Sequence, residues 1–101
     1  MTVAIGTIFV CSWGYDQTNV DFYEVVKVTK ASVVVREIAQ DTESSDGNWT
    51  GNARPRAGDY SGEPMTRRLA AGWDGGPRIK IKSYSSAGVW DGKPARFTSY
   101  A

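Results

Sequence analysis

Short runs of β-branched and aromatic residues recur along the whole chain, and Gly, Pro, Asn and Asp separate them. No long segment places its apolar residues at the three- and four-residue spacing of an amphipathic helix. Short apolar runs bounded by turn residues are typical of strands, so the pattern predicts an all-β protein. The 101 residues suffice for one domain with its own core, and residues 1–101 are interpreted as a single β-barrel domain.

Six strands are expected. The clearest is the run from 78 to 84, where Ile79 and Ile81 alternate with cations and therefore face the opposite side of the sheet from them. The best hairpin joins the second and third runs through a tight turn at 30–31. The expected strands are Thr7 to Trp13, Asp21 to Thr29, Ser32 to Ile38, Met65 to Ala70, Arg78 to Tyr84 and Ala95 to Tyr100.

This pattern favours a small, strongly bent barrel, SH3-like as the first choice and OB-like as the second. Apolar residues occupy both faces of the second run, which predicts either a bulge near Glu24 or a strand covered on both sides. We expect one group of strand residues to be buried together in the core. Its members are Phe22, Val26, Val35, Ile79 and Ile81.

Residues 40–64 are polar and rich in Gly, Ser, Asp and Arg. Such a composition is interpreted as a long mobile loop with room for one short strand, because it offers little apolar area to offset ordering. Residues 73–77 and 90–94 share the tripeptide Trp-Asp-Gly and are expected to be turns.

The chain lacks the usual equipment of an enzyme. It has no histidine, and its single cysteine, Cys11, excludes an intramolecular disulfide and is expected to be a buried, inert thiol. The candidate carboxylates are Asp16, Asp21 and Glu24, but Asp16 opens a polar stretch typical of a hydrogen-bonded turn. We therefore expect no enzymatic activity and no cofactor.

Known ion-binding patterns are also missing. The acidic residues between 41 and 46 lack the glycine and glutamate positions of a calcium-binding EF-hand loop. The glycines between 72 and 76 are not followed by the lysine of a phosphate-binding loop. No metal site is predicted.

Charge is distributed unevenly along the chain. Residues 1–50 contain three cations and seven anions, whereas residues 51–101 contain nine cations and four anions. Such asymmetry is compatible with a face for an acidic partner, or with two halves that neutralise each other across one barrel. The net charge of +1 gives little long-range steering toward a polyanion.

Two binding surfaces are candidates. A row of cations on one sheet face would suit nucleic acid. The row consists of Arg78, Lys80 and Lys82, and Arg67 or Arg68 from the preceding strand could join it. Arg54, Arg56, Lys93 and Arg96 could extend that row, and Tyr84 and the tryptophans nearby could stack on bases. Aromatic residues in loops beside arginine would instead suit a protein partner. The tryptophans in question are Trp49, Trp73 and Trp90.

A family resemblance accompanies these patterns. The segment 12–26, which begins Ser-Trp-Gly-Tyr-Asp-Gln-Thr-Asn, resembles a signature of small uncharacterised proteins of bacteriophages and mobile elements, especially in actinobacteria. Weaker similarity extends through 33–38, the region of Arg54-Pro55 and Gly58, 81–84, and the end of the chain, at 90–94 and 99–101. The chain departs from the group at Glu37, where a proline is expected. The resemblance implies a phage context and no established activity or site residue.

The sequence therefore predicts a non-enzymatic phage accessory protein that binds a host or phage protein. Its alternative is a barrel that binds nucleic acid through a basic strand face. The apolar run at 3–11 is too short to span a membrane, and the chain is expected to be soluble in the cytoplasm of the infected bacterium.

Overall fold

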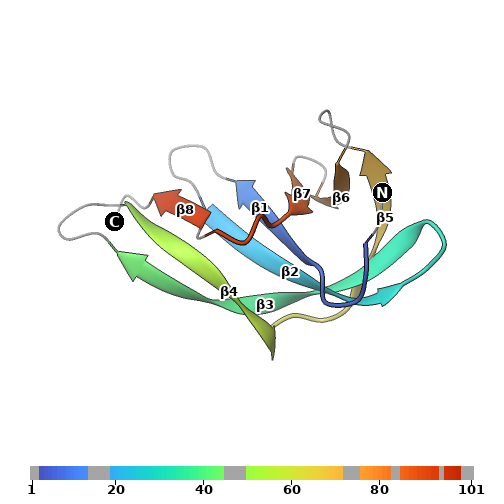
Figure 1. Cartoon of the computed structure of the whole chain (residues 1–101), viewed down its shortest axis with the longest axis horizontal. Coiled ribbons are helices and arrows are strands. Elements are labelled where there is room, and N and C mark those ends of the chain that lie inside the picture. The colour runs from blue at the N-terminus through green and yellow to red at the C-terminus, as the bar shows by residue number, and fades with distance from the viewer. Residues whose placement is uncertain are drawn as a thin grey trace.

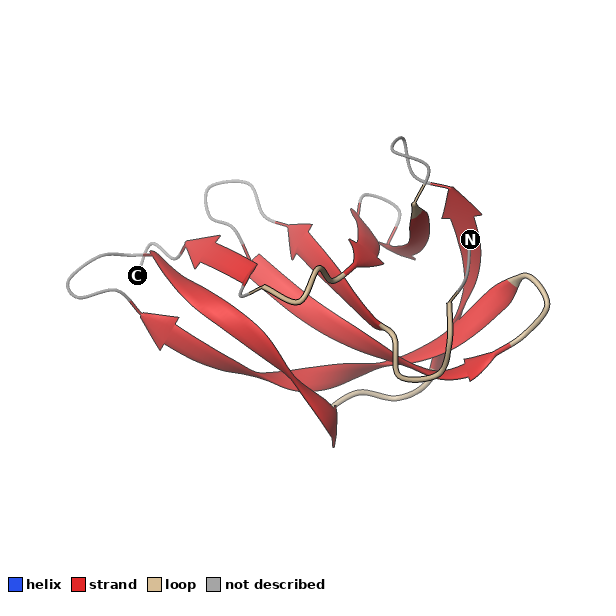
Figure 2. Cartoon of the chain, viewed as in Figure 1, coloured by secondary structure: helices blue, strands red, loops and turns tan. Residues whose placement is uncertain are grey.

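The computed structural model of this chain describes residues 3–13, 19–44, 50–71, 76–82, 85–93 and 95–98. All regular structure in these ranges is β-strand, as Figure 2 shows, and no helix there could cross a membrane. The all-β prediction is confirmed. The strands are β1 (Ile8–Trp13), β2 (Asn19–Val28), β3 (Ser32–Ser44), β4 (Thr50–Tyr60), β5 (Met65–Ala71), β6 (Pro77–Lys82), β7 (Ser85–Val89) and β8 (Ala95–Thr98).

Six of these strands close an antiparallel barrel. Their order is β2–β1–β7–β6–β5–β3, and β3 returns to pair with β2. Closure leaves these six strands without the open edges of a flat sheet. The predicted small barrel is confirmed, whereas the choice between an SH3-like and an OB-like barrel stays a prediction.

Strand β3 is long enough to change partners along one side. Its first part, Ser32–Val35, pairs with β5, and its second part, from Ile38 to Ser44, pairs with β4. Strand β8 then pairs with the start of β4. We call β3 from Gln40 onward, together with β4 and β8, the arm. Figure 1 shows β4 and β8 at the left of the molecule, with β5, β6 and β7 at the upper right.

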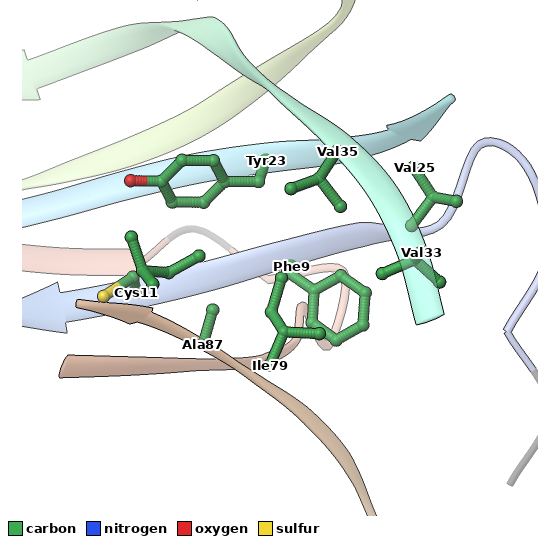
Figure 3. Packing of buried hydrophobic residues seen from close by; sticks show 9 residues of the cluster. Phe9, Cys11, Tyr23, Val25, Val33, Val35, Ile79 and Ala87 are labelled. Carbon is green, nitrogen blue, oxygen red and sulfur yellow. The ribbon is translucent and has the colours of Figure 1, made fainter. Parts of the chain in front are cut away.

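The barrel interior is filled by one apolar core. Side chains that alternate along the strands point inward and meet one another, as Figure 3 shows. Partly buried Val3, Met65 and Leu69 pack against this core. Its buried members are Phe9, Cys11, Tyr23, Val25, Val33, Val35, Ile79, Ile81 and Ala87.

A second core lies outside the barrel wall, between β1 and β2 and the arm. Phe22 points away from the barrel interior, since its neighbour Tyr23 points inward. Strand β2 is therefore covered on both sides, and a bulge between Val25 and Lys27 shifts its register against β3. The strand thus has both features that were expected as alternatives, coverage on both sides and a bulge close to Glu24. The second core consists of Val20, Phe22, Ile38 and Ala53, with Ile8, Val10, Trp90 and Ala95 packed against it.

The predicted loop over residues 40–64 is wrong. Strand β3 continues to Ser44, and β4 occupies eleven residues of the supposed loop. Composition misled because strand pairing here needs few apolar side chains: Gly51 and Ala53 are buried, and their small size lets the arm lie close to the second core.

Two further predictions need correction. Strand β7 was not expected, because its Ser-Ser-Ala-Gly sequence has weak strand propensity, yet it closes the barrel between β6 and β1. The predicted core residues are also not buried together, since Phe22 belongs to the second core. Val26 is only half-buried, at the bulge of β2.

Several predicted features lie outside the described residues. These are the turn beginning at Asp16, most of the turn at 73–77, and Tyr84. The turn at 90–94 is described up to Lys93, where Gly92 has a φ of 87° and the Asp91 carboxylate accepts a hydrogen bond from the Lys93 amide at 2.9 Å. A positive φ suits glycine, so this turn forms by the chemistry that was expected.

Candidate functional site

The outer side of β5, β6 and β7 carries cations separated by small residues. On β5, Met65 and Leu69 pack against the barrel core, so exposed Arg68 between them points outward. On β6, Ile79 and Ile81 are buried and alternate with the outward-facing Arg78 and Lys80, as predicted. We call this surface the basic face. Its outward residues are Arg68, Ala70, Arg78, Lys80, Ser86 and Gly88.

Strand register sets these residues side by side. Arg78 lies between Ala70 of β5 and Gly88 of β7, and Lys80 lies beside Ser86. The β5–β6 pairing ends at Leu69 and Ile79, and the residues that follow, Arg68 and Lys80, both face outward on the same side. Like charges in such positions destabilise a sheet, and β5, β6 and β7 contain five cations and no carboxylate to relieve the repulsion.

The guanidinium of Arg78 is held across the neighbouring strand. Its Nη2 donates a hydrogen bond to Ser86 Oγ at 3.2 Å. A Cβ built on Gly88 would lie only 2.9 Å from Arg78 Nη1, so glycine leaves the space that this side chain occupies. The Arg78 charge is thus fixed on the sheet instead of extending freely into solvent.

Arg67 does not join the basic face. It shares the inward face of β5 with Met65 and Leu69, and its Nη1 and Nη2 donate to the carbonyl oxygens of Thr66 at 2.9 Å and Ile81 at 3.5 Å. Of the two arginines proposed for the row, Arg68 is therefore the outward one. Lys82 ends β6, and its side chain lies outside the described part of the structure.

Arg67 contributes instead to a polar region inside the barrel. Burial raises the pKa of Tyr23 above its ordinary value, and the nearby charges of Asp21 and Glu37 raise it further. The positive charge of Arg67 opposes this increase. These groups therefore interact within the barrel end, separate from the outward charges of the basic face.

Trp90 serves the second core. Its ring meets Phe22 edge-on, with ring centroids 6.1 Å apart, and its Nε1 donates to the Lys93 carbonyl oxygen at 2.6 Å. This half-buried tryptophan closes one side of the second core, next to the β7–β8 connection. The other two tryptophans proposed as contacts, Trp49 and Trp73, lie outside the described residues.

The arm places its arginines among carboxylates. Arg56 lies 3.7 Å from the Asp41 carboxylate and 3.4 Å from that of Asp59. Exposed Arg54 lines a shallow hollow together with Asp41 and Glu43. Arg54 and Arg56 therefore do not extend the basic face, which is formed by other strands.

Glu24, one of the candidate carboxylates, anchors the end of β4. It is 7% exposed and accepts hydrogen bonds from the Gly58 amide at 2.9 Å and from the Tyr60 hydroxyl at 2.8 Å. The bond to Glu24 raises the pKa of Tyr60. Arg36 lies over the Tyr60 ring, 4.6 Å from its centroid. Glu24 thus has a structural role, and its partners leave no obvious place for a substrate.

No match was found when the chain was compared with protein-family models, curated proteins and solved structures. Among the described residues, no cluster of His, Cys, Asp and Glu could hold a metal ion. The geometry of the basic face is therefore the basis for assigning a function. Ser86 and Gly88 were not predicted from the sequence as residues of the site. The only indication in the sequence was their position between the predicted basic strand and the turn that begins at Trp90.

Proposed function

We propose that this protein binds the phosphate backbone of nucleic acid through the basic face. One observation carries the proposal: Arg78 and Lys80 of β6 and Arg68 of the neighbouring β5 face outward on the same side, on strands that contain no carboxylate. A polyanion would remove the repulsion between these cations on binding. Local rules of sheet stability are most often broken where a surface has a function.

The positions of these cations support the same conclusion. Arg78 and Lys80 are two residues apart on β6, a separation of about 6.7 Å along the strand, and Arg68 lies one strand away, about 4.8 Å. The separation between Arg78 and Lys80 is similar to that between successive phosphates along one strand of a nucleic acid. Arg78 is also held in place by Ser86, which limits the side-chain entropy lost on binding.

Such an activity needs no catalytic group. Together with the sequence resemblance, it suggests an accessory protein acting in the cytoplasm of a phage-infected bacterium. Because only about three phosphates are contacted, the affinity should be modest and strongly dependent on salt.

The test compares two triple variants that remove equal charge. Arg68, Arg78 and Lys80 are changed to Gln in one, and Arg54, Arg56 and Lys93 in the other, which leaves the basic face intact. Binding to a fluorescent mixed-sequence DNA duplex is followed by anisotropy at low salt. We expect the first variant to lose binding and the second to keep most of it. Equal losses, or no binding by the unchanged protein, would refute the proposal.

A protein partner is the second candidate, favoured by one described feature. Tyr60 is 40% exposed beneath Arg36, and an exposed tyrosine beside arginine is typical of interface hot spots. Under this alternative, Trp49→Ala or Trp73→Ala should weaken binding to a host or phage protein by about 2 kcal/mol. Changes to the basic face should then chiefly slow association.

A further inference from the structure

The geometry points to double-stranded nucleic acid as the ligand of the basic face, held by its phosphates without recognition of base sequence. This inference rests on the proposed function and narrows its ligand. It depends on three features of the face: the residue types of its strands, the orientation of Arg78 and the shape of the barrel wall.

The first feature is the residue composition of the three strands. Strands β5, β6 and β7 contain no Phe, Tyr or Trp. Proteins that bind single strands combine cations with aromatic side chains on which bases stack, and each stacked base contributes about 1–3 kcal/mol. Within these three strands the basic face offers cations without such a stacking surface, so the strands themselves gain little from unpaired bases.

The second feature is the direction of the Arg78 side chain. Its guanidinium lies across β7, bonded to Ser86 Oγ and packed over Gly88. An arginine that reads guanine must reach into a groove and make two hydrogen bonds to the base edge. Arg78 is held along the sheet surface, where phosphate oxygens can approach it but base edges cannot.

The third feature is the shape of the surface. The basic face forms part of the outer wall of a closed barrel, which curves outward, and its central positions are the small residues Ala70, Ser86 and Gly88. Single strands are usually bound along a groove. An outward-curving wall can instead rest against the phosphates that line the surface of a duplex.

Electrostatics then favours the duplex over the single strand. A duplex carries one negative charge per about 1.7 Å of its axis, roughly twice the density of one strand. Each phosphate contact changes the slope of log affinity against log salt by about −0.9 for a duplex and about −0.7 for a single strand. For three contacts, the duplex should therefore gain about four-fold more affinity per ten-fold decrease in salt.

The experiment measures anisotropy with the full chain and three probes of equal length: a DNA duplex, an RNA duplex, and a mixed-sequence DNA strand that cannot pair with itself. Salt is varied for each. We expect tighter binding to both duplexes than to the single strand, duplex slopes near −2.7, and affinities for DNA and RNA duplexes within a few fold. Two duplexes of different sequence should bind equally.

Tighter binding of the single strand, accompanied by quenching of tryptophan emission, would overturn the inference while leaving the proposed function intact. A more than ten-fold preference for one duplex type or one sequence would also overturn it, because phosphates alone would not explain recognition. Gly88→Ala offers a finer check, since the added Cβ must displace Arg78; it should weaken duplex binding, but less than Arg78→Gln. Failure of all three probes to bind would refute the proposed function itself.

Discussion

The basic face and the arm use the same kinds of charged residues in opposite ways. The strands of the arm contain three cations and three carboxylates, and Arg56 lies between Asp41 and Asp59. The strands of the basic face contain five cations and no carboxylate. The arm therefore places carboxylates beside its cations, whereas the strands of the basic face carry cations alone.

The two regions also differ in what holds them in place. The basic face belongs to the closed barrel, whose interior core it covers. The arm is attached through the second core and through the bonds of Glu24 to Gly58 and Tyr60. Perturbing the arm should therefore change stability more than nucleic-acid binding, and perturbing the basic face should do the reverse.

The largest effect on stability is expected from Phe22→Ala. Phe22 is fully buried in the second core and contacts Trp90 edge-on, so truncation should lower the free energy of unfolding by about 3–5 kcal/mol. Urea denaturation measures the change. If this variant fails to fold, Phe22→Leu provides a milder test. A loss below about 1 kcal/mol for Phe22→Ala would show that the second core does not hold the arm.

A smaller loss is expected from Tyr60→Phe, which removes one hydrogen bond from the buried Glu24 carboxylate. The free energy of unfolding should fall by about 1–2 kcal/mol, because Glu24 keeps only its bond from the Gly58 amide. Duplex affinity should remain unchanged. A double-mutant cycle with Glu24→Ala, which removes the acceptor, isolates the pair, and a coupling energy near zero would contradict its anchoring role.

Alkaline pH tests two tyrosines, Tyr23 in the barrel core and Tyr60 in the arm. The pKa values of Tyr23 and Tyr60 are raised, by burial and by the Glu24 bond respectively, so the folded protein holds both protons more tightly than the unfolded chain. The contribution of these two tyrosines to stability should therefore be constant below about pH 10 and fall as pH rises above it. Tyr23→Phe should reduce this fall in urea denaturation measured across that range. Stability that rises with alkaline pH would contradict the assignment.

The smallest effect distinguishes the basic face most directly from an ordinary charged surface. Because Arg68 and Lys80 face the same side of neighbouring strands, Arg68→Gln should raise the free energy of unfolding by about 0.2–1 kcal/mol at low salt, and high salt should abolish the gain. Arg56→Gln is the control, since it removes a cation that has carboxylate partners. A destabilising Arg68→Gln would show that the two cations do not repel each other.

Sequence patterns captured the barrel well where side chains alternate strongly. Ile79 and Ile81 are buried as expected, and their alternation with Arg78 and Lys80 correctly predicted the two faces of β6. The arm escaped prediction because Gly51 and Ala53, its inward residues, carry no hydrophobic signal. Their burial depends on the apposition of β4 to Phe22, a contact between distant parts of the chain.

The candidate site could be predicted only in part, because some of its residues are brought together by pairing between strands. Alternation along β6 placed Arg78 and Lys80 on one face, but only pairing between strands could decide between Arg67 and Arg68. The roles of Ser86 and Gly88 depend on the position of β7, whose composition is weakly β-forming. Sequence could not show that Arg56 of the arm lies between two carboxylates while the described cations of the basic face have no ion pair, because that difference exists only in three dimensions.

The most direct test of the central claim is the salt dependence of duplex binding. Changing Arg68, Arg78 and Lys80 to Gln removes the outward cations of the basic face, and the proposal predicts that the slope of log affinity against log salt becomes shallower by about 2.7. The same measurement on a variant with Arg54, Arg56 and Lys93 changed to Gln should leave the slope nearly unchanged. If the variant of the basic face kept the slope of the unchanged protein, that face would not be the surface that contacts phosphate.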